Sequence, residues 1–374
     1  MKNILITGGA GFIGTNLALQ LIDKGYSVTV LDNLSPQIHT KESTLLASIK
    51  DKVNFIQGDV RNISDWETAL KNQDAIIHLA AETGTGQSMY EISKYVDVNI
   101  QGTAHLLDYL TNEQHAIKKV IIASSRAIYG EGKYTCTKHG DVYPLARVDE
   151  DLLQKDFNVK CPICHDTVTL ELTDEESKIH PTSIYGITKQ NQEQMIMVTC
   201  KALNIPAVAF RYQNVYGPGQ SLSNPYTGIL SIFSTRIKNG NNLSIFEDGA
   251  ESRDFVYIDD VVDATILGLE KEEANGEVFN VGSGVGTTVT TVAELLKENY
   301  GADIDIQITG NYRLGDIRHN IADLVKIKEK LGFKSKVTFA EGLQKFTNWV
   351  NTQNVETDNY ETSILELKEK GLYK

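Results

Sequence analysis

Residues 7–14 read TGGAGFIG and join an apolar run, residues 3–7 (NILIT), to residues 14–24, whose apolar side chains recur with helical spacing. A strand, a glycine-rich turn and a helix in this order predict a dinucleotide-binding unit. Gly8 allows the tight turn, Gly11 lets the backbone approach a pyrophosphate, and Gly14 lets the helix pack on the strand. The free N–H groups at the start of the helix then face the phosphates.

Further apolar runs alternate with helical stretches up to about residue 212. They are residues 27–32, 53–57, 75–80, 120–124 and 207–211. Continuous apolar strands separated by helices predict a parallel sheet that is covered on both faces. Later elements are more mixed, and the charged tail after residue 351 is expected to be only partly ordered.

The composition excludes several classes of partner. The chain of 374 residues carries 36 Lys and Arg against 49 Asp and Glu, a formal net charge of −13. An acidic chain without a basic run repels nucleic acid and anionic membranes. No apolar run approaches the roughly 18 residues that span a bilayer, and the first residues show no signal-peptide pattern. We therefore expect a cytoplasmic protein that binds neither nucleic acid nor membrane.

Acidic residues follow the second and third strands. Asp32 ends the second strand, about 20 residues after the glycine turn, where a carboxylate accepts hydrogen bonds from ribose hydroxyls. It would repel a 2′-phosphate, so NAD is preferred over NADP. Asp59 and Val60 follow the third strand and could contact the adenine, although Gly58-Asp59 could equally be plain turn chemistry.

Tyr185 and Lys189 lie at positions i and i+4 of a helix that is predicted over residues 183–203, so they share one face. An ammonium beside a phenol stabilises the phenolate and lowers the tyrosine pKa from about 10. Such a base can take a proton from a sugar hydroxyl while a hydride leaves the same carbon. Ser124 and Ser125 end an earlier strand, and a hydroxyl there could bind the substrate oxygen or relay the proton.

Five motifs occur in order along the chain: TGGAGFIG, IIASSRAIYG, YGITK, FRYQNVYGPG and SRDFVYIDD. Together they resemble the extended short-chain dehydrogenase/reductases, in the nucleotide-sugar epimerase/dehydratase family. The resemblance implies an α/β fold, with a Rossmann-type doubly wound parallel sheet in residues 1–212. It also implies a smaller mixed substrate-binding lobe in residues 213–374, discontinuous with the Rossmann domain, and a homodimer paired through helices near 98–110 and 185–203.

The resemblance also assigns roles to residues at matching positions. The catalytic residues would be Ser125, Tyr185 and Lys189. NAD would contact the glycine turn, the strand ends and the helix that carries the catalytic tyrosine: Gly8, Gly11, Phe12, Ile13, Gly14, Asp32, Asn33, Asp59, Val60, Leu79, Ala80, Ala81, Asn99, Ser124, Tyr185 and Lys189. The nucleotide sugar would contact six residues, whose arginines suit phosphate oxygens: Ser125, Arg126, Tyr185, Asn214, Arg253 and Arg313.

The two residues after Ser125 limit the reactions that the chain is expected to catalyse. Dehydratases of this family place Asp-Glu directly after the catalytic Ser/Thr, whereas this chain has Arg126 and Ala127, so dehydration is disfavoured. A 4-epimerase needs the tyrosine, the serine and bound NAD, which takes a hydride from C4 and returns it to the opposite face. A 4-ketoreductase acting on an NDP-4-keto-6-deoxyhexose would share these motifs, but we expect it to favour NADPH. A non-catalytic NAD-sensing protein is disfavoured because Tyr185 and Lys189 are both kept.

Residues 131–180 are polar and contain two short ligand pairs, Cys136-x2-His139 and Cys161-x2-Cys164. Two such pairs match a zinc ribbon with four tetrahedral ligands, and the metal would fold a segment too poor in apolar residues to build a core. All four positions are filled, so the zinc is predicted to be structural. His165 could replace His139, and reduced free cysteines in a loop are the alternative. Cys200 is expected to lie in the core.

The insertion lies between Ser125 and Tyr185, where UDP-galactose epimerases have a much shorter segment. With CTKHG, CPIC, SSRAIYG and GPGQSLSNPYTGIL, the chain looks like the subfamily of dTDP-6-deoxysugar 4-epimerases. That resemblance implies interconversion of dTDP-L-rhamnose and dTDP-6-deoxy-L-talose, a step of deoxysugar biosynthesis. A UDP-hexose 4-epimerase is the alternative that keeps the same chemistry.

Overall fold

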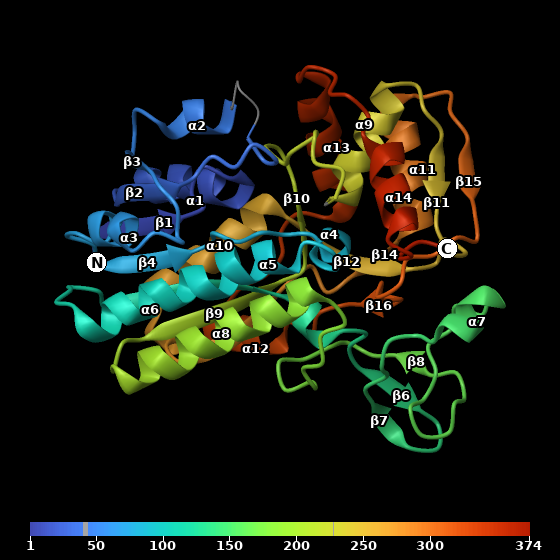
Figure 1. Cartoon of the computed structure of the whole chain (residues 1–374), viewed down its shortest axis with the longest axis horizontal. Helices are drawn as coiled ribbons and strands as arrows, with labels where there is room; N and C mark the ends of the chain where they lie inside the picture. Colours follow the sequence, from blue (N-terminus) through green and yellow to red (C-terminus); the bar gives the residue numbers. More distant parts are fainter. Residues whose placement is uncertain (40–43, 227) are drawn as a thin grey trace.

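A parallel β-sheet forms the centre of the computed structural model, which describes residues 1–39, 44–226 and 228–374 (Figure 1). In the described part of the chain the sheet has seven strands in the order β13-β9-β5-β4-β1-β2-β3, and all neighbours are parallel. This confirms the predicted Rossmann-type sheet. The strands are β1 Asn3–Thr7, β2 Ser27–Asp32, β3 Asn54–Gln57, β4 Ala75–His78, β5 Lys119–Ser125, β9 Ala207–Tyr212 and β13 Glu277–Val281.

Helices cover both faces of this sheet because alternate residues of each strand point to opposite sides. Ile4 and Ile6 of β1 are buried in one core with Leu17, whereas Leu5 is buried in a second core with Leu106. Each fully buried side chain of this size contributes about 1.5–3 kcal/mol. The first core includes α1 Phe12–Asp23 and α10 Ile258–Glu270, and the second includes α3 Ile63–Ala69, α6 Gly102–Asn112 and α8 Ile184–Ala202.

The helix before α6 contains an unusual turn. It begins as α5, Ile92–Tyr95, continues as a π-helical turn over Val96–Gln101, and then becomes α6. A π-helical turn inserts an extra residue per turn and is frequent at functional sites. Here it carries Asn99, which is fully buried. Two further short helices are α2 Thr44–Ile49 and α4 Thr85–Ser88.

A second, mixed lobe follows β9, as the family resemblance implied. It contains a four-stranded sheet with parallel and antiparallel pairs, and a two-stranded parallel sheet. Its strands are β10 Asn214–Tyr216, β11 Leu243–Ile245, β12 Ser252–Tyr257, β14 Gly286–Thr288, β15 Ile306–Ile308 and β16 His319–Asn320. Its helices are α9 Ile229–Lys238, α11 Val289–Tyr300, α13 Phe339–Asn351 and α14 Tyr360–Glu369.

Residues beyond 212 also complete the central sheet. Strand β13 pairs with β9 along its whole length, from Glu277 opposite Val208 to Val281 opposite Tyr212. Helices α10 and α12 (Val325–Leu331) pack against the sheet at this end. The range assigned from sequence to the substrate lobe therefore contributes to both units, because the chain crosses back to cover an edge that β9 alone would leave unpaired.

The tail after residue 351 is more ordered than expected. Its helix α14 buries Tyr360, Ile364 and Leu367 in a small apolar cluster with Phe246 and Tyr90 packed against it. The apolar residues recur every three or four positions, so one face of a charged helix suffices to hold the tail on the protein. None of the helices in residues 1–39, 44–226 and 228–374 combines the length and the apolar character that a membrane crossing demands.

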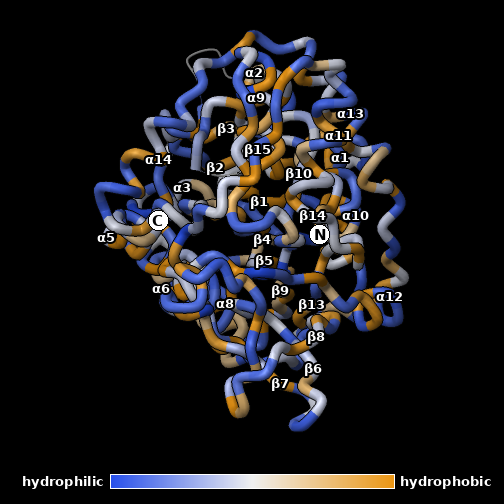
Figure 2. Tube along the Cα trace, turned by 90° about the vertical axis from the view of Figure 1, so that its right-hand side faces the viewer, coloured by the Kyte–Doolittle hydropathy of each residue, from blue (hydrophilic) through white to orange (hydrophobic). Residues whose placement is uncertain are grey.

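The insertion forms a small unit of its own beside the second lobe (Figures 1 and 2). Its antiparallel strands are β6 Tyr134–Cys136, β7 Gly140–Val142 and β8 Thr169–Leu170, with helix α7, Asp149–Leu153, after β7. Its core holds only five buried apolar or cysteine side chains, namely Tyr134, Cys136, Val142, Val159 and Cys161. Such a small core leaves most of the unit's stability to other interactions.

Asp260 is expected to hold the second lobe against α10. It is buried, and its carboxylate accepts hydrogen bonds from Ser335 Oγ and from the backbone N–H groups of residues 336 and 337. Asp260→Ala would leave those donors without a partner and should lower the free energy of unfolding by about 1–3 kcal/mol. Asp259→Ala removes the same charge from the same helical turn at an exposed position. Urea unfolding of the two variants should differ; equal losses would contradict the assignment.

Candidate functional site

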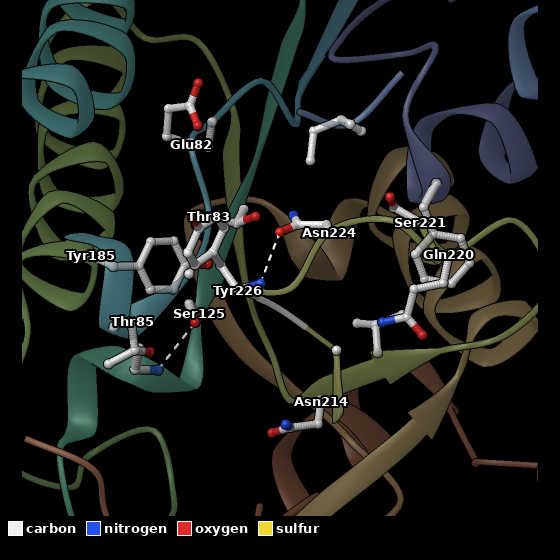
Figure 3. A pocket seen from close by; sticks show the side chains of 18 of the residues that line it. Glu82, Thr83, Thr85, Ser125, Tyr185, Asn214, Gln220, Ser221, Asn224 and Tyr226 are labelled. Carbon is white, nitrogen blue, oxygen red and sulfur yellow. Dashed lines mark hydrogen bonds between the residues drawn. The ribbon is translucent and has the colours of Figure 1, made fainter. Parts of the chain in front are cut away.

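A cavity of about 580 Å³ opens where the carboxyl ends of β1, β4 and β5 meet residues of the second lobe. In an open parallel sheet ligands bind at the point where strand order reverses, which here lies between β1 and β4. The lining includes the glycine turn, Asp32, Ser125, Tyr185 and Lys189. Figure 3 shows Tyr185 pointing into this space from α8, with Ser125 nearby and Asn214, Gln220 and Ser221 on elements across the cavity.

The glycine turn leaves no room for a side chain at Gly8 or Gly14. A Cβ on Gly14 would lie 2.5 Å from Gly8 O and from Gly9 Cα, and a Cβ on Gly8 would lie 2.9 Å from the backbone of Ala80. Gly8 also has φ +65°, which favours glycine. Helix α1 therefore starts directly above the ends of β1 and β4, and Phe12 and Ile13 line the cavity. Its first N–H groups suit the phosphates of a dinucleotide.

Asp32 lies at the cavity wall and is held by the turn. Its carboxylate accepts hydrogen bonds from the backbone N–H groups of Ala10, at 3.0 Å, and Leu34, at 2.9 Å. His39 Nε2 lies 3.4 Å from the same carboxylate. The carboxylate is thus oriented at the end of β2, where the sequence predicted a ribose contact, and it retains lone pairs toward the cavity.

Asp59 is turned toward other side chains, whereas Val60 lines the cavity. Two hydrogen bonds from the Arg61 guanidinium and one from Asn33 Nδ2 occupy the Asp59 carboxylate. The side-chain hydrogen bond with Arg61 is the main cause that lowers the pKa of Asp59 to about 2. The structure therefore gives Asp59 a role in ordering the loop after β3, and it does not bring the carboxylate to the cavity lining.

Asn99 lies behind the wall of the cavity. Its Oδ1 accepts from the Glu82 N–H at 2.7 Å, and its Nδ2 donates to Glu82 O and to Thr188 Oγ1. The side chain joins the loop after β4, which carries Leu79, Ala80 and Ala81 to the lining, to the helix of Tyr185. Asn99 was predicted to line the nicotinamide side, and the structure assigns it to positioning that lining instead.

Tyr185 sits in the first turn of α8, whose start is capped by Ser183 Oγ accepting from the Gly186 N–H. Burial raises the pKa of the Tyr185 phenol, and a hydrogen bond with Ser125 and the charge of Arg126 oppose that rise. The sequence predicted a pKa lowered by Lys189. The structure differs because Lys189 Nζ donates to Gln192 Oε1 at 2.7 Å, and because burial lowers the pKa of the ammonium itself to about 7.

A buried polar chain that sequence reasoning missed runs behind Lys189. Gln192 Nε2 donates to Thr103 Oγ1, whose hydroxyl also lies 3.0 Å from His78 Nε2. His78 Nδ1 lies 2.7 Å from Thr7 Oγ1, at the end of β1. Burial lowers the pKa of His78 to about 3, so the imidazole is neutral. The sequence signal for this chain was the polar residue His78 at the end of the otherwise apolar run AIIH.

Ser124 lines the cavity, but its hydroxyl is hydrogen-bonded to a residue of α8. Its Oγ donates to Glu193 Oε2 at 2.5 Å, and Glu193 accepts two further bonds from the Arg211 guanidinium. Glu193 and Arg211 were not predicted from sequence. Their buried ion pair joins α8 to β9 beside Ser124, and so fixes the helix of Tyr185 relative to the end of β5 that carries Ser125.

The opposite side of the cavity carries the arginines predicted to bind substrate. Arg126 Nε donates to Asn214 Oδ1 at 2.8 Å, and burial lowers the pKa of Arg126 to about 10. Arg253 and Arg313 both lie against one carboxylate, Asp316, at 3.4 Å and 2.7 Å. The sequence prediction included the two arginines but missed Asp316. Arg253 is distant from Asp316 in the chain, and the segment that joins Arg313 to Asp316 reads in the sequence as an ordinary turn.

Residues from the end of the chain close this side. Tyr360, Leu367 and Leu372 line the cavity, although the tail was expected to be only partly ordered. Glu366 Oε2 accepts hydrogen bonds from the hydroxyls of Tyr90 and of Tyr226, which lines the cavity. Within the motif GPGQSLSNPYTGIL, Thr227 lies outside the described residues. Of the other motif residues, six line the cavity: Gln220, Ser221, Asn224, Tyr226, Gly228 and Ile229.

The cysteine-containing insertion brings its predicted ligands together. The ligand atoms of Cys136, His139, Cys161 and Cys164 all lie within 4.8 Å of one another. Cys136 Sγ lies 3.7 Å from Cys164 Sγ and 3.5 Å from His139 Nδ1. Zinc–sulfur bonds of about 2.3 Å in tetrahedral geometry place two sulfurs about 3.8 Å apart. The residues therefore fit a tetrahedral metal ion, with His139 rather than His165 in the cluster, and Cys200 is buried in α8.

The chain matches a known family over most of its length. The model of the NAD dependent epimerase/dehydratase family matches residues 4–147 and 163–282. A dTDP-L-rhamnose 4-epimerase of Burkholderia thailandensis is 37% identical over 353 residues, covering 93% of this chain and 95% of that protein. A putative UDP-glucose 4-epimerase of Methanocaldococcus jannaschii is 29% identical, covering 94% of this chain and 99% of its own.

Solved structures of 4-epimerases have the same fold. A UDP-glucose 4-epimerase of Thermotoga maritima, solved with UDP-glucose, aligns with a TM-score of 0.75 at 33% identity. That alignment covers 93% of this chain and 98% of the other. A UDP-glucuronic acid 4-epimerase of Bacillus cereus, in complex with UDP-glucuronic acid and NAD, aligns with a TM-score of 0.77 at 26% identity. It covers 93% of this chain and 99% of the other.

His78 is expected to make the stability of the protein depend on pH. Its pKa is about 3 in the folded protein and about 6.5 when unfolded, so the unfolded chain binds the proton first. Stability is therefore lost as the pH falls below about 6.5, at up to about 1.4 kcal/mol per pH unit. His78→Gln removes this contribution, so urea unfolding across that range should show a shallower slope than wild type. Parallel curves would contradict the assignment.

Proposed function

The chain belongs to the NAD-dependent epimerase/dehydratase family, and on that basis we propose that it is a nucleotide-sugar 4-epimerase acting through a transient 4-keto sugar. One observation carries this proposal. Tyr185, Ser125 and Lys189 share a single cavity with the glycine turn and with Asp32. The two residues after Ser125 are Arg126 and Ala127, and neither can serve as the acid or base that expels water. The site therefore has the groups for reversible oxidation at one carbon, and the two positions after Ser125 offer no acid or base for dehydration.

The residues divide the work as follows. The glycine turn and Asp32 would hold NAD, which would supply the acceptor for the hydride from the sugar C4 and the donor for its return. The Tyr185 phenolate accepts the proton of the C4 hydroxyl, and Ser125 Oγ hydrogen-bonds the same oxygen. The Lys189 side chain stabilises the phenolate only while the lysine is protonated. Because the pKa of Lys189 is about 7, this stabilisation depends on pH. The 4-keto sugar must then turn in the cavity, so that the hydride returns to its other face.

The proposed substrate is a dTDP-6-deoxyhexose, with dTDP-L-rhamnose and dTDP-6-deoxy-L-talose as the interconverted pair. Two observations support it: the 37% identity to a dTDP-L-rhamnose 4-epimerase over 93% of this chain, and the cysteine-containing insertion. A UDP-hexose 4-epimerase is the second candidate, favoured by the likeness to UDP-sugar epimerases. A 4-ketoreductase is less compatible with the carboxylate of Asp32, which would repel the 2′-phosphate of NADPH.

We expect the purified protein to invert C4 of a nucleotide sugar without added reductant. A panel of dTDP-, UDP-, GDP- and CDP-sugars followed by NMR measures this directly. Tyr185→Phe removes the base and should lower kcat by a factor of about 10²–10⁴. Tyr26→Phe deletes the same hydroxyl from a tyrosine that bonds Glu270 outside the cavity, and it should leave kcat unchanged. Turnover only with added NAD(P)H would indicate a reductase, and a fully active Tyr185→Phe would refute the mechanism.

We also propose that Cys136, His139, Cys161 and Cys164 hold a structural zinc ion. All four ligands come from the protein, which leaves no position for a reacting water, and the five-residue core of the insertion is too small to fold unaided. The zinc would cross-link the loop after β6 to the Cys161–Cys164 turn. It takes no part in the hydride transfer.

Metal analysis should find about one zinc ion per chain. Cys161→Ser is expected to lose the zinc and to expose the insertion to proteolysis, because the remaining three ligands bind far more weakly. Cys200→Ala alters the one cysteine outside the cluster, in the core of α8, and should retain the metal. Stoichiometric zinc in Cys161→Ser, or its absence from the wild type, would refute the site.

A homodimer is part of this proposal. Helix α8 carries Ile187 and Val198 with 41% and 69% of their surface exposed, and α6 packs beside it on the same face of the sheet. Pairing of these two helices across a two-fold axis would cover both side chains. Light scattering of the purified protein measures its oligomeric state.

A further inference from the structure

The loop between β15 and β16 separates the insertion from the cavity. Tyr312 is buried in an apolar cluster with Leu152 and Phe157 of the insertion, and Leu314 packs against the same cluster. Arg313, between them in sequence, lines the cavity, and so does Leu314. The loop therefore reaches the cavity through Arg313 and Leu314, while its Tyr312 is buried against the insertion.

Asp149 of helix α7 in the insertion makes two polar contacts, one with the same loop and one with Lys374. The Tyr312 hydroxyl donates to Asp149 Oδ1 at 2.5 Å, and Lys374, at the end of the chain, also bonds Asp149. The backbone of Tyr312 in turn exchanges hydrogen bonds with that of Lys374. The loop is thus held on one side by the insertion and on the other by the C-terminal residues.

Arg147 makes the most extensive of these contacts. It lies between the two metal-ligand pairs in sequence, and its side chain is only 4% exposed. Its guanidinium donates two hydrogen bonds to the Glu247 carboxylate, at 2.6 Å and 2.7 Å, and a third to the backbone oxygen of Asp316 at 3.1 Å. Arg318 donates to the same Glu247 carboxylate at 3.0 Å. A bidentate pair of this kind fixes orientation as well as position.

Asp316 connects Arg147 to the arginines that line the cavity. Its backbone oxygen is held by Arg147, while its carboxylate contacts Arg253 at 3.4 Å and Arg313 at 2.7 Å. In the described residues Arg313 Nε has no hydrogen-bond partner. Two guanidinium groups beside one carboxylate give the cluster of Arg253, Arg313 and Asp316 one more positive than negative charge. That arrangement suits an anion carrying more than one charge.

We propose that Arg147 is a positioning residue, through which the cysteine-containing insertion orients Arg253 and Arg313 for the diphosphate of the nucleotide sugar. This rests on the proposed function, since the diphosphate belongs to that substrate. The loop that carries Arg313 and Asp316 has no regular secondary structure between β15 and β16. Holding it in one conformation before the substrate arrives removes an entropic cost from binding.

Arg147→Lys tests the inference, because lysine keeps the positive charge but cannot form the two parallel bonds to Glu247. The measurement is calorimetric binding of dTDP and UDP to the NAD-loaded protein. We expect the Kd of the nucleoside diphosphate to rise about tenfold, the size of a coupling carried through a packed network. NAD affinity and zinc content should not change, because neither site contacts Arg147. In turnover assays of Arg147→Lys, KM should rise while kcat should stay unchanged.

A matched control comes from an exposed residue of the insertion. Glu171 bonds Thr135 at an exposed position and makes no contact with the loop, so Glu171→Gln should leave the Kd of dTDP and UDP unchanged. Tyr312→Phe breaks the bond to Asp149 without removing a charge, and it should also raise this Kd, which keeps the inference testable where Arg147→Lys folds poorly. An unchanged Kd in folded Arg147→Lys and in Tyr312→Phe would overturn it.

The failure of this inference and the failure of the proposed function are distinguishable. Binding of dTDP and UDP requires no turnover, so a protein that does not invert C4 could still show the effect of Arg147→Lys. A protein that inverts C4 normally, but binds dTDP and UDP equally well with Arg147 or Lys at that position, refutes the positioning role alone.

Discussion

The packing of the glycine turn against the two central strands constrains the rest of the structure. Neither Gly8 nor Gly14 could carry a Cβ, because backbone atoms of Gly9 and Ala80 lie within 2.9 Å of where it would be. Backbone cannot move aside as a flexible side chain can, so α1, β1 and β4 meet in one arrangement. The cavity opens at this meeting point, and the end of β5 and the start of α8 bring Ser125 and Tyr185 to its wall.

Burial decides the ionisation of the groups around the cavity. Tyr185 and Lys189 share a helical face, yet burial raises the pKa of the phenol and lowers that of the ammonium. Gln192 takes the hydrogen bond of Lys189 and continues through Thr103 to His78. A charged group in this interior is stabilised only by the partner that faces it, so a bound ligand can change the ionisation of the pair.

The substrate side of the cavity is assembled from distant segments. Arg253 comes from β12, Arg313 and Asp316 from the loop after β15, and Tyr360 from the C-terminal helix. These three segments are far apart in the sequence, so the mutual geometry of the residues that they carry depends on the contacts behind them. The insertion supplies many of those contacts through Arg147 and α7. A small unit that is far from the hydride transfer can therefore affect how the substrate is held.

The sequence by itself determined the parallel sheet, the dinucleotide turn, the tyrosine and lysine on one helical face, and the four clustered metal ligands. Each of these follows from periodicity or spacing within a short segment, and β1 and β2 have the predicted ends. The tertiary structure alone decided the place of β13 in the sheet, the contact of Lys189 with Gln192, the role of Asn99 behind the wall, and the network around Asp316. These depend on partners far apart in the chain and on burial, and no local pattern of residues encodes either.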